Sequence, residues 1–158
     1  MALSKGKEFE KIIFDSTTSL FPKVDITRLY DTTNGYKTIH NPSDFIAYCY
    51  PTHYYIECKS RQGNTLSISE ITQLEDLKTK SKVYGNLAGV ILWYIKHKRV
   101  FWVDIRYIEE LEKSGAKSIN INEIDLQSKY IYEIPSKTPR VYPQMFMEEF
   151  FNNVKLGD

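Results

Sequence analysis

The fold is decided by residues 44–59, whose sequence is DFIAYCYPTHYYIECK. Two runs rich in aromatic and β-branched residues, 44–50 and 53–59, are separated by Pro-Thr, and this pattern predicts a β-hairpin. Successive side chains of a strand point to opposite faces, so Glu57 and Lys59 share one face. The alternate positions form an apolar face that we expect to be the core: Tyr54, Ile56 and Cys58. We therefore expect Glu57 and Lys59 to face outward.

The spacing of the hairpin also places Asp44. Opposite residues of an antiparallel pair have a constant sum of residue numbers, about 101 to 103 for a tight turn at this position. Asp44 then lies on the same face as Glu57 and Lys59, opposite one or the other. An even spacing would instead set Asp44 against Cys58.

Two carboxylates and one amine at this position suggest metal-dependent phosphodiester hydrolysis. Neighbouring carboxylates repel unless a cation lies between them. Mg²⁺ prefers one or two carboxylates, several waters and phosphate oxygens. The amine of Lys59 would stabilise negative charge that develops on the phosphorus. A plain exposed ion pair between Glu57 and Lys59 is the alternative explanation of the pattern.

The rest of the chain predicts an α/β (α+β) fold with helices on a mixed central sheet. Apolar spacing and turn residues predict helices at 4–21, 68–84 and 106–114, strands at 87–95 and 99–105, and a further helix at 143–154. The polar stretch 31–42 is predicted to be a loop. The strand at 87–95 shows no polar alternation, which indicates burial on both faces.

Composition excludes several classes of protein. The 158 residues are 42% hydrophobic and carry a net charge of +1, so neither a disordered chain nor a polybasic coat is expected. Cys49 and Cys58 are too few for a disulfide framework or a zinc site, and we expect buried, reduced thiols. No apolar run is long enough to span a membrane, and no P-loop or Rossmann glycine motif suggests a nucleotide cofactor. A cytoplasmic protein without membrane contact is expected.

A longer motif is similar to a known family. Residues 41–77, NPSDFIAYCYPTHYYIECKSRQGNTLSISEITQLEDL, contain Asp44, then Glu-x-Lys thirteen residues later, a polar loop and a Gln on the next predicted helix. This order resembles the RecU-type Holliday-junction resolvases, a branch of the PD-(D/E)xK nuclease superfamily. Residues 6–10, GKEFE, are similar to the family's N-terminal helix motif. The resemblance covers roughly residues 5–121.

The resemblance implies a restriction-endonuclease-like fold and assigns roles to individual residues. Asp44, Glu57 and Gln73 would hold Mg²⁺, with Mn²⁺ as a substitute, and Lys59 would stabilise the transition state. Glu10 would lie near the metal as a further catalytic carboxylate, or else be a solvated charge on the helix face.

The resemblance also implies a homodimer acting on branched DNA, namely a four-way junction. DNA-binding residues are predicted around the site: Lys7, Arg28, Tyr36 and Arg61. The family carries a long stalk before the metal-binding Asp, but only residues 22–41 occupy that interval here. A short loop or reduced stalk fits this interval, as in a compact phage or mobile-element variant.

We therefore predict one nuclease domain over residues 1–158. Its parts are an N-terminal helix (1–21), the short loop or stalk (22–42), a catalytic core (43–105), and C-terminal helices and strands (106–158). The predicted function is Mg²⁺-dependent resolution of Holliday junctions by symmetric paired nicks in DNA recombination and repair. Two alternatives stay open: a related nuclease for flaps or forks, and a non-catalytic DNA-binding or recombinase-modulating module with the same fold.

Overall fold

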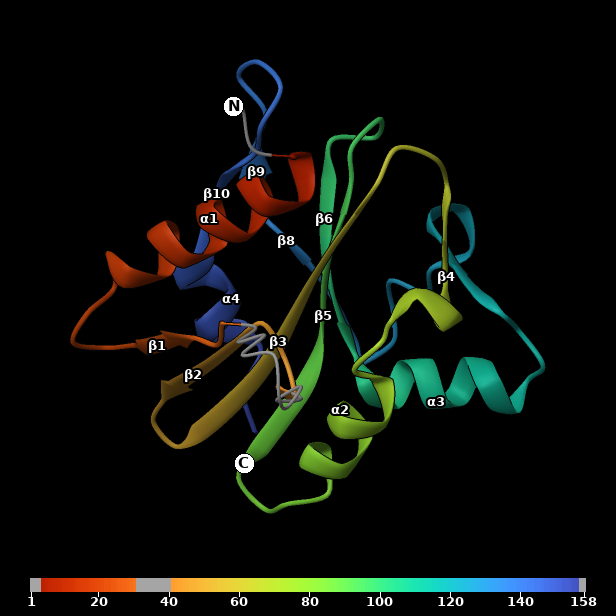
Figure 1. Cartoon of the computed structure of the whole chain (residues 1–158), viewed down its shortest axis with the longest axis horizontal. Helices are drawn as coiled ribbons and strands as arrows, with labels where there is room; N and C mark the ends of the chain where they lie inside the picture. The colour runs from red at the N-terminus through yellow and green to blue at the C-terminus, as the bar shows by residue number, and fades with distance from the viewer. Residues whose placement is uncertain (1–3, 31–40, 157–158) are drawn as a thin grey trace, which may run out of the picture.

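The protein is built on a six-stranded mixed sheet, seen in a computed structural model that describes residues 4–30 and 41–156 (Figure 1). The strand order is β1-β2-β3-β5-β6-β8. The strands are β1 (Asp25–Arg28), β2 (Phe45–Cys49), β3 (Thr52–Arg61), β5 (Asn86–Tyr94), β6 (Arg99–Asp104) and β8 (Ile131–Ile134). The expected fold class, a mixed central sheet flanked by helices, is confirmed.

The predicted hairpin is present as β2 and β3. Phe45 pairs with Ile56 and Cys49 with Thr52, so the sum of paired residue numbers is 101. β3 continues in parallel with β5, and β5 pairs antiparallel with β6. β3 and β5 are thus the central strands of the sheet, and eight of the nine residues of β5 are buried, as predicted.

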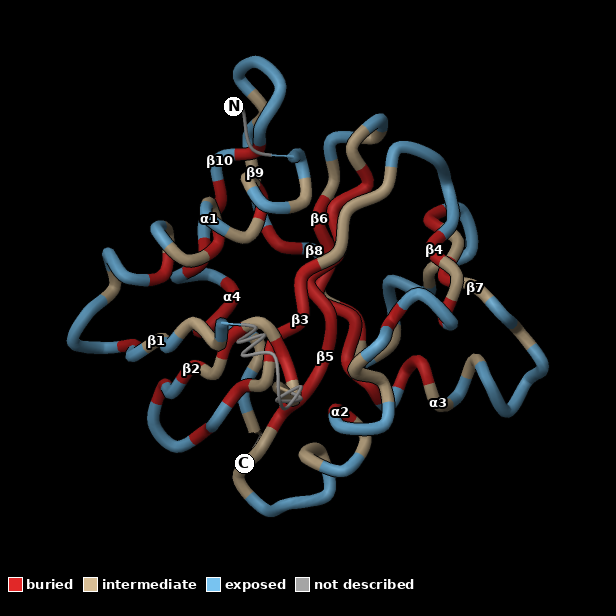
Figure 2. The backbone as a smooth tube through the Cα atoms, in the orientation of Figure 1, coloured by how far each residue is buried: buried red, intermediate tan, exposed pale blue. Residues whose placement is uncertain are grey.

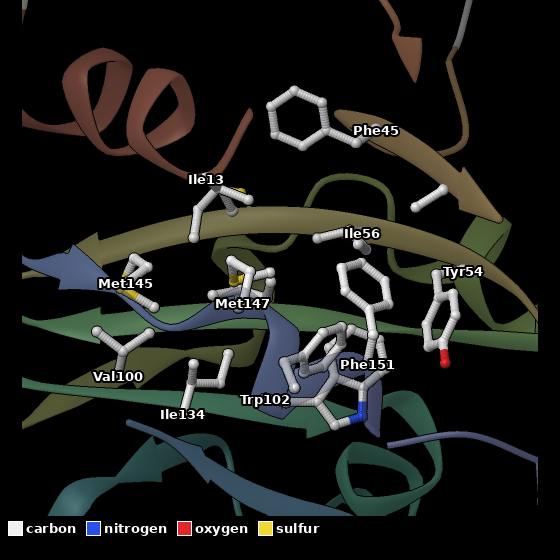
Figure 3. Close-up of a cluster of buried hydrophobic side chains, with 14 of the residues drawn as sticks. Ile13, Phe45, Tyr54, Ile56, Val100, Trp102, Ile134, Met145, Met147 and Phe151 are labelled. Atoms are coloured by element: carbon white, nitrogen blue, oxygen red, sulfur yellow. The ribbon is translucent and has the colours of Figure 1, made fainter. Parts of the chain in front are cut away.

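Helices cover both faces of the sheet. On one face, α1 (Lys5–Thr18) and α4 (Met147–Asn153) pack onto β3 and β8 (Figure 3). On the other face, α2 (Leu74–Ser81) and α3 (Ile105–Lys113) pack onto β5 and β6. The colours of Figure 2 show β5 buried through almost its whole length.

The outward position predicted for Glu57 is therefore wrong. The Glu57 side has its own apolar cluster, in which Leu77 and Ile108 pack against β5 and β6, and only 2% of Glu57 is exposed. The hairpin pattern alone describes β3 as half of a two-stranded ribbon, whereas β3 is an interior strand with β5 on its other edge.

Two of the predicted helices are shorter than expected because other elements take up part of their range. The periodic residues of 68–84 belong to a 3-10 turn (Ile68–Glu70) and then α2, because Ile68, Ile71 and Leu77 all pack in the same apolar cluster. Ile71 between them has φ −87° and ψ 88°, which is not helical. The C-terminal helix begins at Met147, since Gln144 and Met145 pair as strand β10 with β9 (Ser136–Lys137).

The first helix ends at Thr18 rather than residue 21, and its N-terminus is capped by the Ser4 hydroxyl, which accepts from Lys7 N–H. Strands β1 and β8 were not predicted, nor was the small pair of β4 (Thr65–Ser67) and β7 (Ser118–Asn120). A second 3-10 turn spans Ile121–Glu123.

Both cysteines are free and buried, as expected from the sequence. Burial holds the pKa of the Cys58 thiol well above its usual value. Among residues 4–30 and 41–156, no helix has the length and apolar character that crossing a membrane requires.

Candidate functional site

Asp44 lies immediately before β2 and turns its side chain toward β3. Its backbone N–H donates to the Ile56 carbonyl at 3.0 Å, so Asp44 is bonded to β3 just ahead of the Phe45–Ile56 pair. Its Oδ2 accepts a hydrogen bond of 2.8 Å from the Cys58 N–H. Its carboxyl group lies beside that of Glu57, the neighbour predicted for it by the sum of 101.

Glu57 is a buried carboxyl group in the middle of the sheet. Its Oε2 atom is buried and has no hydrogen-bond donor. Burial raises the pKa of Glu57 to about 10, and the neighbouring Asp44 carboxyl and the charge of Glu10 add to this rise, while Lys59 opposes it. A carboxylate at this depth requires a cation or a proton, because an isolated buried charge is very costly.

Glu10 of α1 contributes a third carboxyl group to the site. Burial and the charge of Asp44 raise its pKa. Two cations partly offset this charge: Lys7 Nζ lies 3.3 Å and Arg28 Nη2 3.8 Å from Glu10 Oε2. Only 12% of the Glu10 side chain is exposed, so it is not a solvated charge on the helix face.

The carboxyl groups fit a hard divalent cation that also takes oxygen ligands from water or substrate. In the described part of the chain, no group of three or more His, Cys, Asp or Glu side chains is arranged to hold a metal ion unaided. Mg²⁺ does not need such a cage, since it keeps several waters and binds through one or two carboxylates plus phosphate oxygens. The orphaned Glu57 Oε2 beside Asp44 supplies this kind of donor set.

An open pocket of about 330 Å³ lies next to these carboxyl groups, between the N-terminus of α1 and the second half of β3. Lys59 and Arg61 line it from β3, and Lys7 and Glu10 line it from α1. The pocket therefore combines cations with the edge of the carboxyl cluster, an arrangement that suits a phosphodiester group.

Arg61 reaches this pocket while paired with Glu70 of the 3-10 turn. Glu70 also accepts from the Ser67 N–H at 3.2 Å in a capping box, which fixes its carboxylate. Sequence reasoning missed Glu70, although the Ser-x-x-Glu pattern of residues 67–70 is a signal for this cap.

The structure thus brings together most of the residues predicted for the site. Asp44, Glu57 and Glu10 form the carboxyl cluster. The other predicted residues border this cluster or line the pocket beside it: Lys59, Lys7, Arg28 and Arg61.

Gln73 and Tyr36 are not placed at the cluster by any observed contact. Gln73 lies at the N-terminus of α2, where its Oε1 accepts from the Thr72 hydroxyl at 2.6 Å. Its role as a metal ligand stays a prediction. Tyr36 lies outside the described residues.

Comparisons with known proteins support the fold. No family model matches the chain, and no curated protein matches its sequence. Among solved structures, the chain is similar to Hjc of Archaeoglobus fulgidus, a Holliday junction resolvase from an archaeal hyperthermophile, at a TM-score of 0.55. The match covers 74% of this chain and 89% of Hjc, at 20% sequence identity. A likeness at this identity shows the fold, which is that of the archaeal resolvase, and does not single out the RecU-type branch.

Proposed function

We propose that the protein is a metal-dependent endodeoxyribonuclease that cuts branched DNA, with the four-way Holliday junction as its substrate. The observation that carries the proposal is the buried Asp44–Glu57 pair, with Glu57 Oε2 unpartnered, next to Lys59 and an open cation-lined pocket. The fold shared with the archaeal junction resolvase Hjc supports the same class of reaction and substrate.

Each side chain has a distinct part in this proposal. Asp44 and Glu57 would hold Mg²⁺ or Mn²⁺, with Gln73 completing its shell. When bound, the metal supplies a polarised phosphate and a water of lowered pKa. The Lys59 ammonium stabilises the negative charge that builds on the phosphate oxygens. Lys7, Arg28 and Arg61 hold the DNA backbone beside the cut.

A homodimer is part of the proposal, because a four-way junction has two equivalent strands to cut. Two identical sites related by a two-fold axis match that symmetry. The native mass in solution tests this part separately from the chemistry.

The central test is cleavage of a labelled synthetic four-way junction in Mg²⁺, with products resolved on a denaturing gel. We expect paired nicks that disappear in EDTA and in the Asp44→Asn variant. Asp15→Asn is the matched control, because Asp15 is an exposed residue of α1 that pairs only with Lys11 among the described side chains. Thermal unfolding checks that both variants are folded.

Two results would contradict the proposal. One is full cleavage by Asp44→Asn. The other is failure of the folded protein to cut any branched DNA in Mg²⁺ or Mn²⁺, which would favour a non-catalytic DNA-binding module.

A nuclease for flaps or forks is the second candidate. It is favoured by the short interval of residues 22–41, which leaves no length for the long stalk of the RecU-type enzymes. Comparing initial rates on junction, flap, fork and linear duplex separates the two. Faster cleavage of a flap or fork than of a junction supports this second candidate.

A further inference from the structure

Exposed aromatic rings gather at one end of the sheet, away from the carboxyl cluster. Tyr50, in the turn between β2 and β3, is 82% exposed, and Tyr84, in the connection from α2 to β5, is fully exposed. The His53 N–H donates to the Gly85 carbonyl at 2.8 Å, which holds these two turns side by side. Figure 2 shows both turns as exposed segments at the lower end of the molecule.

A second pair of rings continues this surface onto the sheet. Tyr48 of β2 and His53 of β3 are cross-strand neighbours whose ring centroids lie 4.5 Å apart. We call the four residues Tyr48, Tyr50, His53 and Tyr84 the aromatic strip. Contiguous exposed ring surface is one mark of a partner-binding site.

The aromatic strip leads toward the carboxyl cluster along β3. His53, Tyr55 and Glu57 share one face of the strand, and at ~3.4 Å per residue His53 is about 14 Å from Glu57. Between them, Lys80 of α2 lies over the Tyr55 ring at 5.5 Å. The strip and the carboxyl cluster therefore lie along the same strand, with a cation of α2 between them.

The charge beside the strip favours nucleic acid. Lys80 and Lys82 lie at the end of α2 that leads into the turn of Tyr84. Asp25 of β1, which pairs with Tyr48, lies on the opposite side of the strip. Aromatic rings next to cations suit single-stranded nucleic acid, because every base has a face that stacks and every phosphate carries a charge.

We propose that the aromatic strip binds unpaired bases of the DNA strand that leads into the cleavage site. The proposal rests on the proposed function for its choice of DNA as the ligand. It predicts that DNA with unpaired nucleotides at the branch point binds more tightly than fully paired DNA of the same length and charge.

The test is fluorescence anisotropy with a labelled oligo-dT strand, in EDTA, so that neither metal nor cleavage is involved. We expect the Tyr50→Ala/Tyr84→Ala double variant to lose at least tenfold in affinity, since one base stacked on an aromatic ring accounts for about that much. The Tyr50→Phe/Tyr84→Phe variant should stay within about twofold, because stacking needs the ring and not the hydroxyl group.

Two controls define the origin of any loss. Phe21→Ala removes an exposed ring outside the strip and should leave affinity unchanged. The dependence of affinity on salt should be the same in the double alanine variant and the native protein, because no phosphate contact is removed.

Other results would overturn the proposal. These are unchanged affinity in the double alanine variant, or a change in its native mass, which would make the strip an interface between two copies of the chain. Failure of junction cleavage with intact oligo-dT binding would contradict the proposed nuclease and leave the strip's role standing, so the two outcomes are distinguishable.

Discussion

β3 and β5 are parallel neighbours at the centre of the same sheet, yet they carry very different side chains. Along β5 the buried residues are apolar apart from a single glycine, whereas β3 carries Glu57 and Lys59. The register sets Glu57 beside Val90, and both side chains are buried, whereas Lys59, beside Leu92, is only half-buried. Depth in the sheet therefore does not explain the charge of Glu57, and its position at the carboxyl cluster does.

The strongest test of the difference between the two strands is to put a carboxyl group on β5. Val90→Glu buries a carboxyl group beside Glu57, on a strand that itself carries no charged side chain. We expect a loss of unfolding free energy of about 4 kcal/mol or more, measured by chemical denaturation. Val90→Ala is the control for lost volume and should cost about 2 kcal/mol. A Val90→Glu protein as stable as the alanine variant would show that the interior of β5 tolerates charge.

Removing the charge of Lys59 should affect activity more than stability. We expect Lys59→Gln to slow cleavage by about 100- to 1000-fold, the usual cost of losing one group that stabilises transition-state charge. Single-turnover rates at saturating DNA measure this step. Lys59→Arg should retain more activity because it keeps the charge, and Lys96→Gln, in the turn after β5, should have little effect. A defect confined to DNA affinity would assign Lys59 to binding instead.

Gly89 of β5 tests how closely the apolar strand is packed. A methyl group there would lie 2.5 Å from the Val103 carbonyl oxygen and 2.9 Å from the Trp102 ring. We expect Gly89→Ala to lower the unfolding free energy by about 1–3 kcal/mol through overpacking. Gly63→Ala, where no atom lies within 4 Å, is the matched control. Equal stability of the two variants would mean that β6 moves aside at no cost.

Because of Glu57, the unfolding free energy of the metal-free protein should decrease as the pH rises. Its pKa is raised to about 10 from an ordinary value of 4.5. The folded state therefore holds a proton that the unfolded chain releases. The unfolding free energy then decreases as the pH rises from 4.5 to about 10. Glu57→Gln should remove this decrease and gain on the order of 5 kcal/mol at pH 8. Thermal unfolding in EDTA from pH 5 to 9 measures it.

Added Mg²⁺ should reverse this pH dependence of stability in the native protein. A metal that binds the ionised carboxylate stabilises the folded state more as the pH rises. The Glu57→Gln variant should show little response to Mg²⁺. Equal stabilisation of both proteins by Mg²⁺ would contradict a metal at Glu57.

The hairpin and its register were predictable because they depend on neighbours in the sequence. Alternation, the turn residues and the constant sum of paired residues predict Asp44 beside Glu57, and the two carboxyl groups are neighbours. The burial of Glu57 was not predictable from the hairpin, because it depends on elements further along the chain. β5 pairs with β3 in the sheet, and α2 packs on the face that carries Glu57.

The elements that were missed gave weak local signals. β1 has four residues, and two of them are exposed, so its pairing with β2 is visible only in the assembled sheet. β8 is a four-residue strand at the other edge of the sheet. The apolar spacing of residues 68–84 was real, but it reflects two short helices packing on one surface, which helical periodicity alone cannot separate.

Within the predicted site, the residues close in sequence to the hairpin were placed most reliably. Glu10 comes from a distant helix and was identified only through the resemblance of residues 6–10. Glu70 was missed because its role depends on Arg61 lying beside it in space.

The odd spacing between Asp44 and Glu57 limits how this hairpin can change length during evolution. Inserting or deleting one residue in the turn would move every later side chain of β3 to the opposite face of the sheet. Glu57 and Cys58 would then exchange faces. Changes of two residues preserve the pairing of the acids. Homologous sequences that keep both acids should therefore differ in this turn by even numbers of residues.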